Sequence, residues 1–232
     1  MASALVDKPK NYREHHQFYK ACHRLVIYWN VFDILKYLYS QRPLNYLKKR
    51  GISRKQIFDW KIGFCDSGEY KNRIIIPSFN EAGDINYFIA RSYSGDWKRY
   101  KNPSASKDII FNDLNVDWDE DVILVEGVFD AFKESNMIPI LGSTISETSE
   151  LFQKIVENNC KVYIALDIDV QKKEKDIILK LLDYGVMVSK IDVSGYEDIS
   201  EMPDQIYFQR KKEAKLINRE NFFEYQFSFA MF

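Results

Sequence analysis

Four acidic residues lie just beyond short apolar runs of this sequence, namely Glu126, Asp167, Asp169 and Asp198. Taken singly, an Asp or Glu after a strand usually caps a helix or forms a turn. Taken together at one edge of a sheet, four carboxylates repel one another and are stable mainly where cations neutralise them. Oxygen ligands without His or Cys select Mg²⁺ or Mn²⁺ over zinc, and such ions support phosphate chemistry. The joint placement therefore predicts a divalent-metal site.

The elements that must position these carboxylates are predicted to form a parallel α/β sheet. Apolar runs predict strands at residues 122–125, 138–141, 161–166 and 186–193. Segments with helical spacing of apolar residues lie between them, at 130–136, 151–156 and 177–182. Strands that alternate with helices favour a parallel sheet, in which ligands bind beyond the carboxyl ends of the strands. Gly127 is expected to let the backbone turn sharply after Glu126, and Gly185 to follow the last helix as its cap.

Upstream of this sheet, the sequence predicts short helices and an antiparallel hairpin. Residues 12–40 carry apolar side chains at helical spacing, and a second helix is expected to end before Gly51. Ser53 is the expected N-cap of a short helix that runs through Trp60. Two β-rich runs flank a turn cluster at 80–84, so residues 73–93 are predicted to form the hairpin.

Charge is divided along the chain, although the 232 residues carry 33 Lys or Arg against 34 Asp or Glu. The segment from Arg42 to Lys101 has 13 basic and 6 acidic residues, a net charge of +7. The segment from Asp108 to Asp204 has 8 basic and 22 acidic residues, a net charge of −14. The near-neutral total argues against nucleic-acid binding, but the division reverses that inference. It is typical of proteins in which one segment meets phosphates and another holds metal ions or stays solvated.

Composition excludes several other classes of protein. Hydrophobic residues make up 46% of the chain, which is enough for a core and excludes general disorder. No apolar run approaches the roughly 20 residues of a membrane span, and no apolar signal sequence precedes the rest. We therefore expect a cytoplasmic protein without membrane contacts. The scattered Cys22, Cys65 and Cys160 form no disulfide framework, and no spacing of Cys and His fits an ordinary zinc finger, so no zinc is expected.

Two groups of motifs resemble those of a known enzyme family. Val125-Glu126-Gly127 with Asp130, then Gly142-Ser143-Thr144, then Asp167-x-Asp169, are similar to the Toprim domain of primases, topoisomerases and some nucleases. The segments upstream are similar in order and spacing to the basic subdomain that precedes Toprim in DnaG-type primases: Tyr46–Ile52, Arg73–Pro77, Phe88–Arg91 and Arg99–Pro103. Over roughly residues 44–200 the chain thus resembles the catalytic core of DnaG-type primases, and it looks closest to those of phages.

This resemblance implies roles for individual residues. Glu126 would be the catalytic metal-binding carboxylate, and Asp167 and Asp169 would be catalytic residues that bind Mg²⁺ or Mn²⁺. Asp198 would be a further metal ligand, with Ser200 where the family has a second Asp. The supporting motif residues would be Gly127, Asp130, Gly142 and Ser143. The residues that match contacts to NTP phosphates and template are Arg73, Arg91, Arg99 and Lys101.

The resemblance also implies an activity and partners. A DNA primase is a nucleotidyltransferase that synthesises short RNA primers from NTPs on a single-stranded DNA template during replication. The family's N-terminal zinc ribbon is not found in this sequence, so either initiation needs a zinc-binding partner in trans or the chain starts without one. The expected partners are a replicative helicase and a zinc-ribbon or single-strand-binding protein in trans. If the chain is phage-encoded, the expected location is the host cytoplasm. Two other hypotheses stay open: a Toprim nuclease with water as nucleophile, and a catalytically silent DNA-binding module of the replisome.

The expected organisation has four parts. An N-terminal helical segment (1–40) is followed by a basic α+β primase subdomain (41–118). A Toprim domain (119–204) follows, with a four-stranded parallel sheet flanked by helices. The aromatic-rich tail (205–232) either covers the core of this chain or docks a partner.

Overall fold

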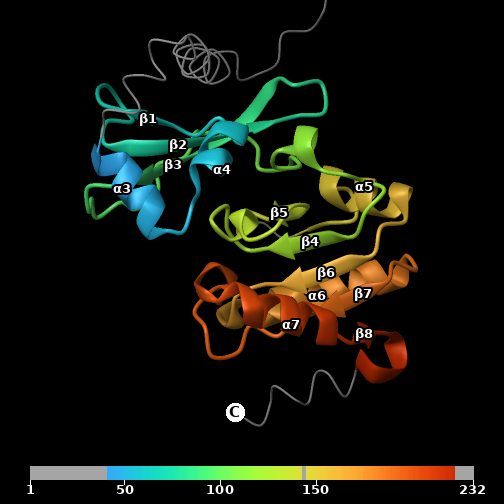
Figure 1. Cartoon of the computed structure of the whole chain (residues 1–232). Helices are drawn as coiled ribbons and strands as arrows, with labels where there is room; N and C mark the ends of the chain where they lie inside the picture. The colour runs from blue at the N-terminus through green and yellow to red at the C-terminus, as the bar shows by residue number, and fades with distance from the viewer. Residues whose placement is uncertain (1–40, 143–144, 223–232) are drawn as a thin grey trace, which may run out of the picture. The chain divides into compact units, whose positions relative to one another are not determined.

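The computed structural model describes residues 41–142 and 145–222 (Figure 1). These residues divide into two compact units. Unit 1 comprises the described residues up to Pro77 together with Tyr87–Ser106, and unit 2 comprises Ser78–Asn86 together with the described residues from Lys107 onward. The helices predicted within residues 1–40 and the aromatic residues after Phe222 lie outside the described residues.

The end of one short helix of unit 1 and the start of the next lie where the sequence predicts. α3 (Gln41–Lys49) is followed by Gly51, which adopts the left-handed φ of +74° that glycine tolerates best. α4 (Arg54–Asp59) has Ser53 as its N-cap. The Ser53 side chain accepts a hydrogen bond from the Gln56 amide, and the Gln56 side chain accepts one from the Ser53 amide. This capping box satisfies two amides that the first helical turn leaves without partners.

A three-stranded sheet contains the predicted hairpin. Its strands are β1 (Gly63–Cys65), β2 (Arg73–Phe79) and β3 (Ile85–Ser92), in the order β1-β2-β3. β1 is antiparallel to β2, and the turn between β2 and β3 closes where the Asn80 amide donates to the Asp84 carbonyl at 2.9 Å. Gly83 supplies the left-handed φ of +84° within this turn.

The tip of the hairpin belongs to unit 2. Ser78 Oγ donates to Asn86 Oδ1 at 2.6 Å and accepts a hydrogen bond from the Asn112 amide at 2.8 Å. Asn86 Nδ2 in turn donates to the Ile110 carbonyl at 3.4 Å. β2 and β3 therefore each have residues in both units. The chain passes from unit 1 to unit 2 after Pro77, returns to unit 1 at Tyr87, and enters unit 2 again at Lys107. The predicted domain boundary at residue 118 stays a prediction.

Unit 2 contains a five-stranded sheet in the order β5-β4-β6-β7-β8. Its strands are β4 (Val122–Val125), β5 (Met137–Pro139), β6 (Val162–Ala165), β7 (Val188–Lys190) and β8 (Leu216–Ile217). The first four are parallel, which confirms the predicted parallel sheet, and β8 is antiparallel to β7. β4 is buried along its whole length, as expected for a strand that is covered on both faces.

Helices cover both faces of this sheet. They are α5 (Glu150–Asn158), α6 (Gln171–Asp183) and α7 (Asp204–Glu213). Ile164 of β6 shares a buried cluster with Phe152 of α5 and Ile178 of α6, so these two helices pack on one face. Tyr163 points to the opposite face because side chains alternate along a strand, and the Lys211 ammonium of α7 lies 5.5 Å from its ring centroid. No helix within the described ranges is long and apolar enough to cross a bilayer.

Some elements of unit 2 differ from the prediction. The helix expected at 130–136 is a single 3₁₀ turn, η2 (Asp130–Phe132). The chain then turns towards β5 at Asn136, which has φ +62° and whose side-chain amide donates to the Asp121 carbonyl at 3.0 Å. α7 and β8 come from the segment that the sequence marks only as a tail. α7 is anchored because Tyr207 and Lys211 both contact the Glu134 carboxylate, the latter at 2.7 Å.

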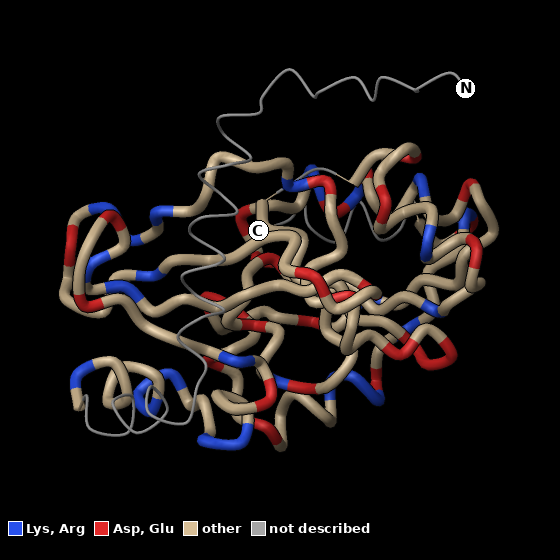
Figure 2. The backbone as a smooth tube through the Cα atoms, turned by 90° about the horizontal axis from the view of Figure 1, so that it is seen from above, with Lys and Arg blue, Asp and Glu red and all other residues tan. Residues whose placement is uncertain are grey.

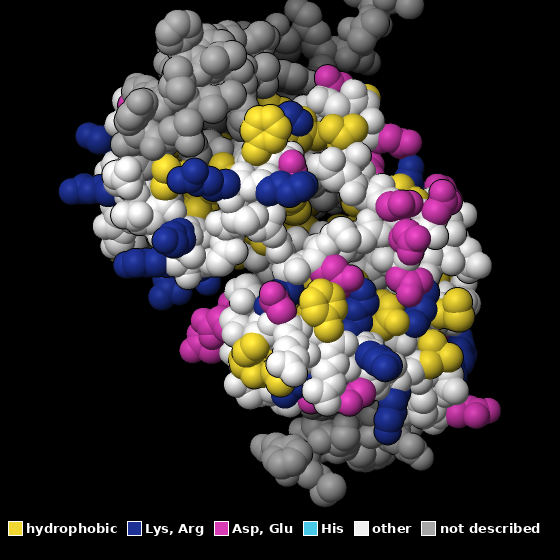
Figure 3. Space-filling model, in the orientation of Figure 1, with side chains coloured by type: hydrophobic (Ala, Val, Ile, Leu, Met, Phe, Trp, Pro, Cys, Tyr) yellow, Lys and Arg dark blue, Asp and Glu magenta, His cyan; other side chains and the backbone are white. Residues whose placement is uncertain are grey.

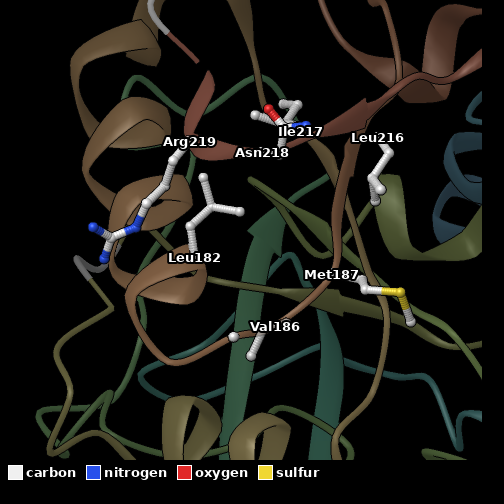
Figure 4. Close-up of a pocket in the computed structure, with 8 residues that line it drawn as sticks. Leu182, Val186, Met187, Leu216, Ile217, Asn218 and Arg219 are labelled. Carbon is white, nitrogen blue, oxygen red and sulfur yellow. The ribbon is translucent and has the colours of Figure 1, made fainter. Parts of the chain in front are cut away.

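A pocket of about 240 Å³ lies at the edge of unit 2 (Figure 4). Leu182 of α6, Met187 before β7, and Leu216 and Ile217 of β8 contribute to its lining. The pocket lies at the amino end of β7, whereas the predicted carboxylates follow the carboxyl ends of the parallel strands. It is therefore separate from the candidate site.

The central strand β6 offers a test of the fold. Ile164 is 0% exposed between β4 and β7, so Ile164→Ala removes buried methyl groups and leaves a cavity. We expect the free energy of unfolding to fall by about 2–5 kcal/mol, measured by urea denaturation. The control Met187→Ala, at a side chain of a residue 51% exposed, should change it by less than about 0.5 kcal/mol. Equal small effects of both variants would contradict the described core.

Candidate functional site

The predicted carboxylates follow the carboxyl ends of the two central strands of unit 2. Glu126 comes directly after β4, and Asp167 and Asp169 come after β6. Val125 of β4 is paired in register with Ala165 of β6, so all three acidic residues leave the sheet at the same edge. Asp167 is partly buried ahead of the 3₁₀ turn η3 (Ile168–Val170), and Asp169 within that turn is exposed. The structure therefore brings Glu126 to the same edge as two acids that lie 41 and 43 residues later in the sequence.

Asp198 reaches the same acidic neighbourhood from beyond β7. It caps the 3₁₀ turn η4 (Ile199–Glu201), accepting hydrogen bonds from the Ser200 hydroxyl at 2.6 Å and the Glu201 amide at 3.1 Å. Ser200, which stands where the family has an acid, is thus a donor to Asp198. Two donors hold the Asp198 carboxylate, which adds negative charge near Asp167.

The neighbouring acids affect the ionisation of Asp167. The pKa of Asp167 is raised to about 6, first by burial and then by the charges of Glu126, Asp198 and Asp169. Each of these causes penalises the ionised form. A half-buried carboxylate surrounded by like charges is a site that a cation would stabilise.

Asp130 is the most buried acid of this edge. Burial raises its pKa to about 7, with further contributions from the charges of Asp198 and Asp167, while hydrogen bonds from the backbone amides of Gly127 and Ser200 act in the opposite direction. Asp130 Oδ2 accepts the Gly127 amide at 2.9 Å. Its position indicates that Asp130 shapes the loop after β4 rather than presenting its oxygens to solvent.

Gly127 and Gly142 leave space beside the acids. Gly127 is predicted to be needed because the backbone turns sharply there. Its φ is not in the left-handed region, however, so the backbone conformation does not require glycine. A Cβ at this position would lie 3.1 Å from Asp130 Oδ2, tighter than most real contacts, so the close approach of that carboxylate requires the missing side chain. Gly142 does adopt a left-handed φ of +73°, and a Cβ there would lie 3.8 Å from Glu126 Oε1. Ser143 lies outside the described residues.

Lys173 is a site residue that sequence reasoning missed. Its Nζ lies 2.9 Å and 3.1 Å from the two carboxylate oxygens of Glu126, and both side chains are largely buried. Lys173 lies in the first turn of α6, where the helix dipole disfavours a cation, so the ion pair with Glu126 offsets that effect. A signal exists in the sequence, since Lys172 and Lys173 follow Asp169 closely at the start of a helical segment.

The donor set determines which metal these residues could hold. It consists of carboxylates, which suit Mg²⁺ or Mn²⁺. Within residues 41–142 and 145–222, no three His, Cys, Asp or Glu side chains converge closely enough to hold an ion as they are placed. Glu126 faces the Lys173 ammonium instead. The chemistry of the acids fits a divalent cation, and binding one would require Glu126 to turn from Lys173 or share its charge.

The predicted basic residues lie in unit 1. Figure 2 marks Lys and Arg along the backbone, and Figure 3 shows them spread over unit 1 while acidic side chains gather around α5. Arg91 is held on both sides: its Nε donates to Tyr46 Oη at 2.8 Å, and its guanidinium lies 4.6 Å from the ring centroid of Tyr100. The Lys101 ammonium contacts Glu69 at 3.2 Å. Both cations are thus fixed in place at a partly accessible surface.

Arg73 has a different environment. It is 3% exposed, and its guanidinium contacts the Asp96 carboxylate at 2.8 Å and donates to the Arg99 carbonyl at 3.3 Å. In this arrangement Arg73 organises the loop after β3, and its expected contact with phosphate stays a prediction. Arg99 itself is exposed.

Comparisons with known proteins identify the fold. No protein-family model and no curated protein matches the sequence. The primase of Aquifex aeolicus, with its zinc-binding and RNA polymerase domains, is 19% identical with a TM-score of 0.70, and the match covers 91% of this chain and 64% of that one. A DnaG primase catalytic domain bound to single-stranded DNA is 15% identical with a TM-score of 0.71, covering 89% and 81%.

A phage structure is also similar. The primase fragment of the bacteriophage T7 primase-helicase is 14% identical with a TM-score of 0.53, covering 72% of each chain. The chain therefore has the α/β fold of DnaG-type primase catalytic cores, as its motifs predict.

Proposed function

We propose that this chain is the catalytic core of a DNA primase, which synthesises short RNA primers on single-stranded DNA from NTPs. The observation that carries the proposal is the acidic edge of unit 2, where burial and then the charges of Glu126 and Asp198 raise the pKa of Asp167. It occurs in a chain with the fold of primase catalytic cores. The chain spans 64% of the Aquifex aeolicus structure, so the activity of that longer protein is a proposal here.

In the proposed reaction, the 3′-hydroxyl of one nucleotide attacks the α-phosphorus of the next NTP. A new P–O bond forms, the bond to pyrophosphate breaks, and the hydroxyl proton is released. Mg²⁺ or Mn²⁺ would stabilise the charge that develops on the leaving pyrophosphate. The residues that would hold these ions are Glu126, Asp167, Asp169 and Asp198. Because Asp167 is partly buried, water would hydrate its carboxylate less.

The basic residues of unit 1 are the proposed contacts to phosphate. Arg91 is a suitable candidate because Tyr46 and Tyr100 hold its guanidinium in one orientation, which reduces the entropy lost when a phosphate is bound. Arg99 and Lys101 would add contacts to the template or the triphosphate. Arg73 would act mainly by holding the loop that carries Arg99, unless it exchanges Asp96 for a phosphate.

Partners follow from what similar structures hold. One DnaG catalytic domain is bound to single-stranded DNA, and T7 primase domains are bound to an RNA/DNA hybrid. We propose the same two classes of nucleic acid for this chain, in a cytoplasmic setting that becomes the host cytoplasm if a phage encodes it. A replicative helicase, a zinc-ribbon protein and a single-strand-binding protein are proposed as protein partners.

Glu126→Gln tests the reaction. The substitution keeps the shape of the side chain but removes the charge that would hold metal, so primer synthesis should fall at least about 100-fold. The assay uses single-stranded templates, labelled NTPs and Mg²⁺ or Mn²⁺, with and without a zinc-ribbon or helicase partner. The matched control is Glu157→Gln, an exposed carboxylate on α5 of the same unit, which should leave synthesis unchanged.

The same assay separates the competing functions. Short RNA that requires NTPs and disappears with Glu126→Gln supports a primase. Shortening of the template without NTPs would instead favour a nuclease that uses the same carboxylates. If the chain binds the template but shows neither activity, even with partners added, the remaining hypothesis is a catalytically silent DNA-binding module of the replisome.

Metal binding should depend on pH. The pKa of Asp167 is raised to about 6 in the metal-free protein. A proton therefore competes with the metal for this carboxylate at a higher pH than it would for an ordinary Asp. Affinity for Mn²⁺ should therefore weaken as the pH falls through about 6, by up to about tenfold per pH unit. Calorimetric titration with Mn²⁺ between about pH 5 and 7.5 measures this. An affinity that is constant over the range would refute the assignment of Asp167 as a ligand.

Lys173 should also limit metal affinity. Lys173→Met removes the ammonium that faces Glu126, so the negative charge at this edge increases and Mn²⁺ should bind more tightly, on the order of tenfold. The control Lys172→Met removes an exposed cation from the neighbouring position of the same helix turn and should have a smaller effect. If both variants bind Mn²⁺ as the unmodified protein does, Lys173 does not compete with metal for Glu126.

A further inference from the structure

Trp97 is the most exposed large apolar side chain in the described part of the chain. It is 91% exposed, compared with 69% for Phe58. Tryptophan is normally buried to a large extent, because its indole has a large apolar area and one polar edge. No ring stacking or cation–π contact of Trp97 occurs among residues 41–142 and 145–222. The indole thus contributes little to the core of unit 1.

The loop that carries Trp97 is firmly held. The Ser92 amide donates to the Arg99 carbonyl at 2.9 Å and closes the loop at its base. Asp96, the residue before Trp97, receives the buried Arg73 guanidinium at 2.8 Å on one carboxylate oxygen and the Lys98 amide at 3.2 Å on the other. The backbone on both sides of Trp97 is therefore fixed, although its side chain faces solvent.

Basic residues follow Trp97 in the sequence. Lys98 and Arg99 follow directly and are exposed, and Lys101 is two residues further on. Tyr100, the other aromatic residue of the segment, already stacks on the Arg91 guanidinium. Trp97 is thus the ring of this segment that remains available for a planar ligand.

We propose that Trp97 is a stacking platform for one base of a single-stranded nucleic acid, with Lys98 and Arg99 contacting the adjoining phosphates. An exposed aromatic ring on a fixed loop, beside exposed cations, is a combination by which proteins bind single strands without reading their sequence. The fixed loop favours binding because the backbone loses little conformational entropy when a base stacks on the ring. This inference rests on the proposed function, since it assigns Trp97 to the template of a primase.

The test is binding of a fluorescein-labelled oligodeoxythymidylate of about 12 nucleotides to the full chain, followed by anisotropy at about 50 mM salt. Trp97→Ala should weaken binding by about fivefold to 150-fold, whereas Trp97→Phe, which keeps a ring, should weaken it by less than about threefold. The matched control Phe58→Ala, at the exposed aromatic of α4, should leave binding unchanged.

A second probe separates stacking from charge. An abasic oligonucleotide of the same length has the phosphates but no bases, so it should bind to the unmodified chain and to Trp97→Ala equally. Removal of the Lys98 or Arg99 charge should instead weaken both probes and reduce the salt dependence by about one phosphate contact each. Circular dichroism would verify that each variant is folded.

Several outcomes would overturn the inference. They are unchanged oligodeoxythymidylate binding by Trp97→Ala, an equal loss for the abasic probe, and no binding of either probe by the unmodified chain. Failure of the proposed function is a different result. If oligodeoxythymidylate binding requires Trp97 but no primer is made, the stacking site stands and the primase proposal falls. If primers are made and Trp97→Ala binds normally, the reverse holds.

Discussion

Repulsion between carboxylates at the carboxyl edge of the parallel sheet is the constraint around which unit 2 is built. Each acid is accommodated in a different way. Glu126 is neutralised by Lys173, while the buried Asp130 accepts a backbone amide and keeps its proton to a higher pH. Asp198 is held by a hydroxyl and a backbone amide. Asp167 remains coupled to its acidic neighbours, with a raised pKa. Such an edge would gain stability from a cation, and the proposed metal site rests on this argument.

Periodic patterns made most of the fold predictable from the sequence. The four parallel strands, α5, α6 and the hairpin come from apolar runs or helical spacing, and local capping chemistry located Gly51, Ser53 and Gly185. These signals are local, so a single sequence is enough to read them. The carboxyl ends of parallel strands also lie at a common edge, so the sequence predicts that Glu126 and Asp167 lie at the same edge.

Features that depend on long-range contacts were not predictable in the same way. Lys173 belongs to the site only because α6 directs its side chain to Glu126, 47 residues earlier in the chain. Arg73 is buried through its pairing with Asp96, which its place in a basic segment of the sequence does not reveal. α7 and β8 have weak patterns of their own and are stabilised by tertiary contacts such as Tyr207 with Glu134. In each case the deciding energy comes from a partner that spacing along the sequence does not identify.

The hairpin of β2 and β3 has a consequence for how this protein can be dissected. Residues 78–86 pack within unit 2 although they lie between two segments of unit 1. A fragment that starts at Lys107 would contain the whole parallel sheet but would leave the buried Asn112 amide without the Ser78 hydroxyl that accepts its hydrogen bond. During synthesis on the ribosome, the tip of the hairpin emerges first and must wait for its partners. The two units therefore cannot be separated by a single cut of the chain, and a chimaera that contains unit 2 has to include residues 78–86.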